Sequence, residues 1–136
     1  MNTINISKDM ETGIPEIDAQ HRELVERINA IILMGAKAFS KEETQKTIDF
    51  LEEYVIKHFS DEEALQVKCG YPFIETHKKL HKQYLFQFEL TKKEFEEKGF
   101  SNSFAMNLND SVTAWIVRHI KTSDADFGKY YTENMK

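Results

Sequence analysis

The residues of this chain that are best suited to chemistry form two pairs, each spaced four positions apart. His58 and Glu62 are the first pair, His77 and His81 are the second, and a Gly-Tyr-Pro turn at residues 70–72 separates them. On an α-helix, residues four apart lie one turn above each other on the same face. Two helices joined by this turn can therefore direct three imidazoles and a carboxylate into one shared space, which is an arrangement typical of metal ligands.

The remaining histidines, His21 and His119, also fall on apolar faces of helical segments. A single histidine on such a face is most often a hydrogen-bonded core residue. Burying all five histidines of the chain without partners would, however, cost several kcal/mol in total. A metal is the simplest common partner for converging ring nitrogens, so the five together predict a metal centre.

Asp124 is a further candidate ligand beside Glu62. It follows His119 by five residues, and a regular α-helix would leave it about 140° away from the histidine's face. For both side chains to reach one centre, the helix must tighten or end near residues 122–123. Asp126 is a rival that spacing alone does not separate from Asp124.

Five imidazoles and two carboxylates are seven protein ligands, which is too many for one tetrahedral or octahedral ion. Two ions that share bridging carboxylates would accommodate them. Nitrogen and oxygen ligands without thiolate favour iron or manganese, whereas a structural zinc ion usually takes four ligands. The ligand set therefore predicts a centre of two ions.

The elements that must position these ligands are four amphipathic helices. Apolar residues recur at spacings of three and four in each of them, and short connections between four such segments favour an all-α, up-down-up-down antiparallel four-helix bundle. We expect residues 1–13 to form an arm packed on the bundle, and the residues after Asp124 to form a short helix or turn docked on its end. The predicted boundaries are Pro15 at the start of the first helix, Ser40 with Glu43 as a capping box, Gly70 at the end of the second helix, Pro72 in the first turn of the third, Gly99 at its end, and Ser101 or Ser103 as the cap of the fourth.

The length, composition and charge of the chain are those of one soluble domain. The 136 residues are 40% hydrophobic and carry a net charge of −5, which gives no basic surface for nucleic acid or anionic membranes. The chain has no apolar run long enough to span a membrane and no signal-peptide layout at its start. Cys69 is the single cysteine, which favours a reducing compartment. We expect a single domain over residues 1–136, cytoplasmic and, because its outer faces are charged, monomeric.

Four segments resemble, in their order and spacing, the hemerythrin family, specifically the single-domain bacterial hemerythrins. Each segment alone is a weak signal, but the four together are specific, and they cover essentially the whole chain. They are I-P-E-I-D-A-Q-H ending at His21, H-F-S-D-E from His58 to Glu62, H-K-K-L-H from His77 to His81, and H-I-K-T-S-D from His119 to Asp124.

This resemblance implies two iron ions bridged by an oxo or hydroxo group, with an open position for dioxygen on the first iron. It also favours Asp124 over Asp126. The implied ligands are His21 and His58 for the first iron, His77, His81 and His119 for the second, and Glu62 and Asp124 as bridging carboxylates.

The resemblance further implies an apolar oxygen pocket lined by Phe59, Trp115, Ile116 and Ile120. These residues are equally well explained as ordinary core, and the two roles are compatible. A dry pocket disfavours protonation and loss of the bound oxygen, so core residues can also protect the ligand.

Three positions depart from the family pattern, and none of them is a predicted ligand. Ile6 stands where the N-terminal arm often has a tryptophan, Gln66 where a methionine is common, and Phe127 where a tyrosine is common. These departures concern the polarity of the pocket, the oxygen affinity and the rate of autoxidation.

Reversible dioxygen binding is the function that the ligand set favours, with the protein as a carrier, store or supplier of oxygen, for instance to an oxygen-consuming enzyme. Sites with four carboxylates and two histidines donate more negative charge and favour high-valent iron that attacks substrates. Five neutral imidazoles favour that chemistry less. We therefore expect an oxygen-binding protein and not an enzyme. The alternatives are a di-iron oxidase or peroxidase, and a sensor of oxygen or iron, at the same site.

Overall fold

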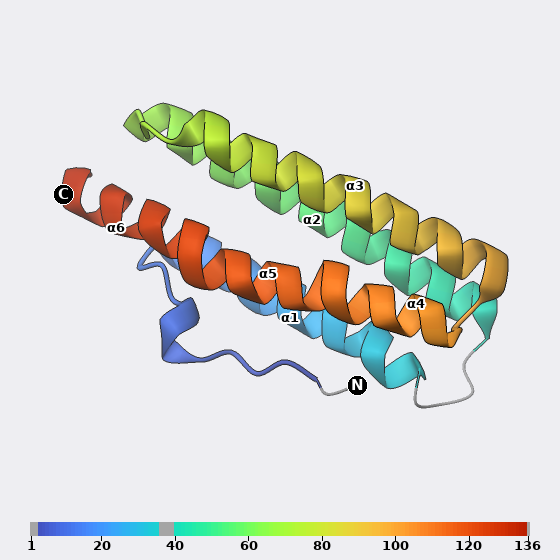
Figure 1. The fold of residues 1–136 in the computed structure, drawn as a ribbon. Coiled ribbons are helices and arrows are strands. Elements are labelled where there is room, and N and C mark those ends of the chain that lie inside the picture. Colours follow the sequence, from blue (N-terminus) through green and yellow to red (C-terminus); the bar gives the residue numbers. More distant parts are fainter. Residues whose placement is uncertain (1–2, 36–39, 136) are drawn as a thin grey trace.

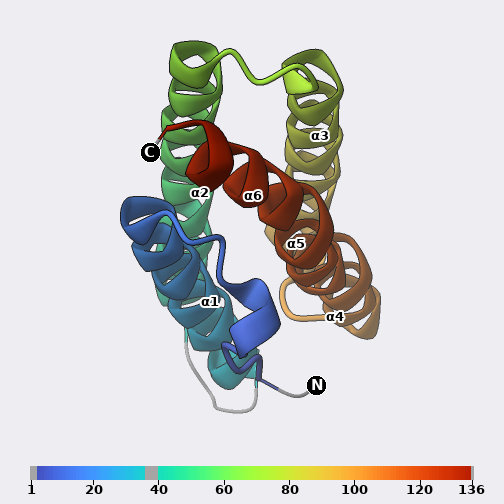
Figure 2. The ribbon, with the colours of Figure 1, turned by 90° about the vertical axis from the view of Figure 1, so that its left-hand side faces the viewer.

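The computed structural model describes residues 3–35 and 40–135, and four helical rods lie side by side in it (Figure 1). Successive rods run in opposite directions, and the short turn between the second and third rods is seen at the top of Figure 2. This arrangement confirms the predicted all-α four-helix bundle. The first three rods are α1 (Pro15–Gly35), α2 (Lys41–Cys69) and α3 (Ile74–Lys98), and the fourth is the continuous series α4 (Asn102–Asn107), η2 (Leu108–Thr113), α5 (Ala114–His119), η3 (Ile120–Asp124) and α6 (Ala125–Asn134).

Polar side chains cap two of the rods where the sequence predicts them. The Ser40 hydroxyl accepts a hydrogen bond from the backbone N–H of Glu43 at the start of α2, at 3.1 Å. At the start of α4, Ser101 accepts one from the N–H of Phe104, at 3.0 Å. Of the two serines that the sequence left open, Ser101 is therefore the cap.

The turn between α2 and α3 differs slightly from the prediction. Gly70 ends α2 with a φ of 67°, the left-handed conformation that glycine adopts at little cost. Pro72, however, lies in the turn, and α3 begins only at Ile74. The proline thus shapes the connection and is not in the first turn of the helix.

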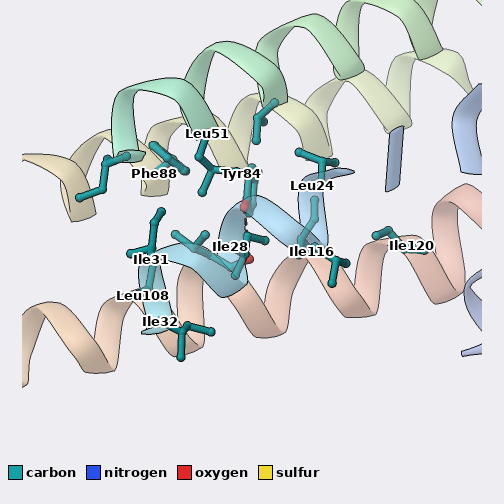
Figure 3. Close-up of a cluster of buried hydrophobic side chains, with 14 of the residues drawn as sticks. Leu24, Ile28, Ile31, Ile32, Leu51, Tyr84, Phe88, Leu108, Ile116 and Ile120 are labelled. Atoms are coloured by element: carbon teal, nitrogen blue, oxygen red, sulfur yellow. Dashed lines mark hydrogen bonds between the residues drawn. The ribbon is translucent and has the colours of Figure 1, made fainter. Parts of the chain in front are cut away.

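The interior of the bundle is apolar above and below one polar level. The larger cluster includes Leu24, Ile28 and Leu51, and Figure 3 shows how side chains from all four rods meet in it. A smaller cluster contains Ile17 and Phe127. His21 lies on α1 between Ile17 and Leu24, so the predicted metal centre sits where the two clusters adjoin.

The fourth rod contains two π-helical segments, η2 and η3, in which a turn takes more residues than in an α-helix. Beside η2, the buried phenol of Tyr84 donates a hydrogen bond to the carbonyl oxygen of Val112, at 3.2 Å. The single polar atom of this core tyrosine is thereby paired. The second π-segment, η3, carries Asp124, one of the predicted metal ligands.

The N-terminal arm packs along the bundle as predicted, although residues 1 and 2 of that prediction lie outside the described residues. The arm contains a short 3₁₀ turn, η1 (Lys8–Met10), whose Met10 is buried. Asn29 of α1 holds the backbone of Ile4 by two hydrogen bonds, of 2.7 and 2.9 Å. None of the helices within residues 3–35 and 40–135 combines the length and apolarity needed to cross a membrane.

Gly128 permits a close approach between the arm and the fourth rod. A Cβ atom added at this glycine would lie 2.2 Å from the carbonyl oxygen of Thr12. Because that neighbour is backbone, it cannot move aside as the end of a side chain can. The packing of the arm against α6 therefore requires a residue without a side chain at position 128.

We predict that Gly128→Ala lowers the free energy of unfolding by about 1–3 kcal/mol, the usual cost of overpacking. In an unobstructed helix the same substitution would stabilise by about 1 kcal/mol, so the sign of the effect is diagnostic. Chemical denaturation of the variant beside Lys129→Ala, an exposed neighbour, measures it. A stabilised Gly128→Ala variant would show that the arm does not constrain α6.

Candidate metal centre

All seven residues predicted as ligands come together at one level of the bundle. Each of them is at most 4% exposed, so the side chains are withdrawn from solvent. They come from all four rods: His21 from α1, His58 and Glu62 from α2, His77 and His81 from α3, His119 from α5 and Asp124 from η3.

Their ligand atoms form two groups, and within each group every pair of atoms lies within 4.8 Å. Both groups contain the carboxylates of Glu62 and Asp124. The smaller group adds His21 and His58, and the larger adds His77, His81 and His119. Each group could hold a cation, and the two groups share both carboxylates.

The two carboxylates are central to the contacts. Oε1 of Glu62 lies 2.6 Å from Nε2 of His77 and 3.1 Å from Nε2 of His81. Oδ1 of Asp124 lies 3.1 Å from Nε2 of both His77 and His119. Its other oxygen, Oδ2, lies 2.9 Å from Nε2 of His21, which belongs to the opposite group. Asp124 thus touches imidazoles of both groups.

Asp124 reaches this position because the helix widens. Residues Ile120–Asp124 form the π-helical segment η3, whose hydrogen bonds join residues five apart. A residue five positions after His119 therefore returns close to the face of that histidine. The expectation that the helix must tighten or end near residues 122–123 is wrong. The rival carboxylate, Asp126, lies on the next segment, α6, outside both groups of ligand atoms.

The outer nitrogens of two histidines are held by residues that do not stand out in the sequence. Nδ1 of His58 donates to Oε1 of Gln20 at 2.7 Å, and Gln20 in turn donates to Asp61 at 2.9 Å. Nδ1 of His81 donates to Oε2 of Glu63 at 2.8 Å. Such bonds fix the orientation of each ring and leave Nε2 directed at the centre. Gln20 and Glu63 pair with rings on other helices, and such pairs leave no periodic signal along the chain.

Burial and the neighbouring charges set the protonation of these histidine side chains. Burial, with repulsion from His21, lowers the pKa of His58 to about 3. Burial, with repulsion from His77, lowers the pKa of His81 to about 4, so both rings keep a free lone pair. At His77 burial opposes the charge, but the adjacent carboxylates of Asp124 and Glu62 outweigh it and raise the pKa to about 9. A bound cation would take the place of the proton shared there.

The donor atoms of the centre fit a bound cation better than they fit each other. Among the described residues, Oε2 of Glu62, both oxygens of Asp124 and both ring nitrogens of His21 lack a well-formed hydrogen bond. Each buried polar atom left in this way costs about 1–3 kcal/mol. Nitrogen and oxygen ligands without thiolate suit iron, so the residues present fit the metal that the family resemblance implies.

Aromatic and branched side chains enclose the centre where an oxygen pocket is predicted. Phe59 stacks on the ring of His81, with centroids 3.8 Å apart and planes within 2°. Trp115 stacks on His119 at 4.7 Å and 17°. Ile116 and Ile120 are buried in the same hydrophobic cluster as Phe59. These two isoleucines, Phe59 and Trp115 together form what we call the apolar wall. Figure 3 shows both isoleucines along the fourth rod.

The three departures from the family pattern occupy different surroundings. Ile6 lies on the arm and is exposed, whereas Gln66 and Phe127 are fully buried. Phe127 belongs to the smaller apolar cluster, and Gln66 lies one helical turn beyond Glu62 on α2.

The fold and the site together define a class: helical bundles that hold cations in their core by imidazoles and carboxylates from facing helices. Comparison with known proteins makes this more specific. The family model of the hemerythrin HHE cation binding domain matches residues 12–131. The chain therefore belongs to the hemerythrin family.

Among curated proteins, several bacteriohemerythrins are similar to this chain over most of its length. The one from Campylobacter jejuni subsp. jejuni serotype O:23/36 is 32% identical over 120 residues, which are 88% of this chain and 89% of the relative. The one from Pseudomonas paraeruginosa is 31% identical over 121 residues, 88% of this chain and 75% of the relative. The one from Stenotrophomonas maltophilia is 27% identical over 116 residues, 85% and 73% of the two chains.

The π-segment yields a prediction about deletions. Removing the exposed Thr122 leaves Asp124 four residues after His119, which restores an ordinary α-helical turn with both side chains on one face. We expect this variant to fold and to take up iron. Deleting Lys57, an exposed residue of the regular helix α2, rotates the residues on one side of the deletion by about 100° relative to the other and should abolish uptake. Metal analysis of both purified variants tests this, and loss of iron from the Thr122 deletion alone would contradict it.

Proposed function

We propose that this protein binds two iron ions at the centre and binds dioxygen reversibly there, as a carrier, store or supplier of oxygen. The observation that carries the proposal is the inequality of the two ligand groups. The group with His21 and His58 offers four protein ligands, and the group with three histidines offers five. The first iron would therefore keep the more open coordination shell, where dioxygen can bind.

The composition of the ligand set supports release of oxygen over its activation. Two carboxylates and five imidazoles, which bind a metal as neutral ligands, donate little negative charge, so they stabilise high-valent iron poorly. A further carboxylate that touches the ligands, Glu63, bonds the outer nitrogen of His81 and is partly exposed. It lies on the far side of that ring, where it cannot deliver a proton to a ligand inside the centre.

The apolar wall supports the same reading. Phe59 and Trp115 cover the rings of His81 and His119, and Ile116 and Ile120 fill the space beside them. A wall of this kind excludes water and disfavours proton transfer to bound oxygen. Dioxygen can then dissociate without having reacted.

The proposal predicts a reversible change in the visible spectrum. Iron-reconstituted, reduced protein should gain a visible absorption band when oxygen is admitted and lose it when the solution is purged with inert gas. Repeated cycles with constant amplitude would establish reversible binding. Irreversible conversion to the oxidised spectrum in the first cycle would instead favour an oxidase, peroxidase or sensor, and absence of any iron spectrum would overturn the metal assignment.

The apolar wall predicts the effect of one added hydroxyl. Ile116→Thr and Ile116→Val remove similar volume from the buried side chain, but threonine also brings a polar group that attracts water. We expect the threonine variant to autoxidise several-fold faster than the valine variant, although both still bind iron. The decay of the oxygenated spectrum measures this. Equal rates in the two variants would show that dryness at this position does not protect the ligand.

A further inference from the structure

Gln66 is a buried polar residue whose side chain has no hydrogen-bond partner in the part of the chain that the structure describes. The side chain is fully buried. Neither its carboxamide nitrogen nor its carboxamide oxygen has a hydrogen-bond partner among residues 3–35 and 40–135. Because burying an unpaired amide is costly, a partner for this group is to be expected outside the protein atoms themselves.

The direction of that partner follows from the helix. Gln66 lies four residues after Glu62 on α2, so the two side chains share one face. Long side chains of a helix lean towards the turn that precedes them, which brings the carboxamide over the turn that carries Glu62. Its neighbours on α2, Leu65 and Cys69, pack against the smaller apolar cluster, which contains Ile17. The polar surroundings of Gln66 therefore lie towards the metal centre, and the apolar surroundings lie away from it.

Glu62 shows a matching deficiency. Its Oε1 contacts His77 and His81, whereas its Oε2 has no hydrogen-bond partner among the described residues. Gln66 and Glu62 do not bond each other directly. A solvent molecule could satisfy the carboxamide, since a buried water typically makes two to four hydrogen bonds to such groups.

We propose that the Gln66 carboxamide is a hydrogen-bonding group of the metal centre, which holds a solvent molecule beside Glu62 when iron is bound. It acts as a positioning residue: it orders solvent at the edge of the centre and is not itself a ligand. This inference rests on the proposed binding of iron, but it does not depend on the reversibility of oxygen binding.

The test measures how strongly iron binding depends on the carboxamide. Gln66→Met keeps the length and volume of the side chain and removes both hydrogen-bonding atoms. Leu65→Met, next to it on α2, is the matched control, because Leu65 packs against the apolar cluster. The melting temperature of each full-length protein is measured without metal and with ferrous iron under anaerobic conditions, so that oxygen chemistry does not enter.

We expect iron to raise the melting temperature of Gln66→Met by less than that of the wild type, with a deficit of about 2–6 °C for the loss of one or two hydrogen bonds. In Leu65→Met the iron-induced rise should equal that of the wild type. The absorption bands of the air-oxidised iron protein should also shift in Gln66→Met and not in the control. A merely structural glutamine would change the two states equally and leave the spectrum alone.

The outcomes separate this inference from the proposed function. Equal iron-induced shifts in Gln66→Met and wild type, with iron bound in both, would overturn the role of Gln66 alone. Failure of the wild type to bind iron would overturn both proposals. Iron binding with a reduced shift in Gln66→Met, but without reversible oxygen binding, would support the role of Gln66 and overturn the oxygen-carrying function.

Discussion

The structure depends on the clustering of five buried imidazoles and two buried carboxylates at a single level of an apolar bundle. Polar groups in such an interior must be paired, and charges must be paired still more strictly. The protein atoms alone meet this demand only in part. Glu62 and Asp124 raise the pKa of His77, which favours its charged form. Burial lowers the pKa of His58 and of His81, which favours their neutral forms. Cations among these groups would relieve both conditions, because they bind the free lone pairs and neutralise the carboxylates.

Several features of the fold position the buried imidazoles and carboxylates at this level of the bundle. Gly70 and the turn after it place α2 and α3 so that Glu62 contacts both histidines of α3. The π-segment η3 returns Asp124 to the face of His119 within a rod that continues without a break into α6. Apolar clusters lie above and below this level, and an interior of low dielectric constant strengthens the electrostatic interactions within it. Gln20 and Glu63 then orient the rings from outside.

Most of the fold and the candidate ligands could be predicted from local patterns. Helical spacing reveals which residues share a face, so His58 with Glu62, and His77 with His81, can be paired from their positions in the chain alone. The prediction failed for the helix geometry around Asp124, where the chain forms a rare π-helical segment. A π-turn differs from an α-turn by one residue, and its cost is met by packing and by contacts around Asp124 that the sequence does not display. The pairing of His81 with Glu63 was equally hidden, since a glutamate beside a buried face looks like any solvated residue.

The same interior combines two requirements that pull against each other. The proposed binding of oxygen would require a dry wall around the ligand, which Phe59, Ile116 and Ile120 could provide. Gln66 places a carboxamide on the helix turn next to Glu62, and a buried amide without a partner among the described residues attracts solvent. Water at that edge would stabilise the charged groups of the centre but would also bring protons nearer to it. The balance between these effects is therefore set by how firmly the solvent is held, since an ordered molecule with all its hydrogen bonds satisfied is a poorer proton donor than a mobile one. A glutamine at this position can supply a hydrogen-bonding group beside Glu62 while the apolar wall stays dry.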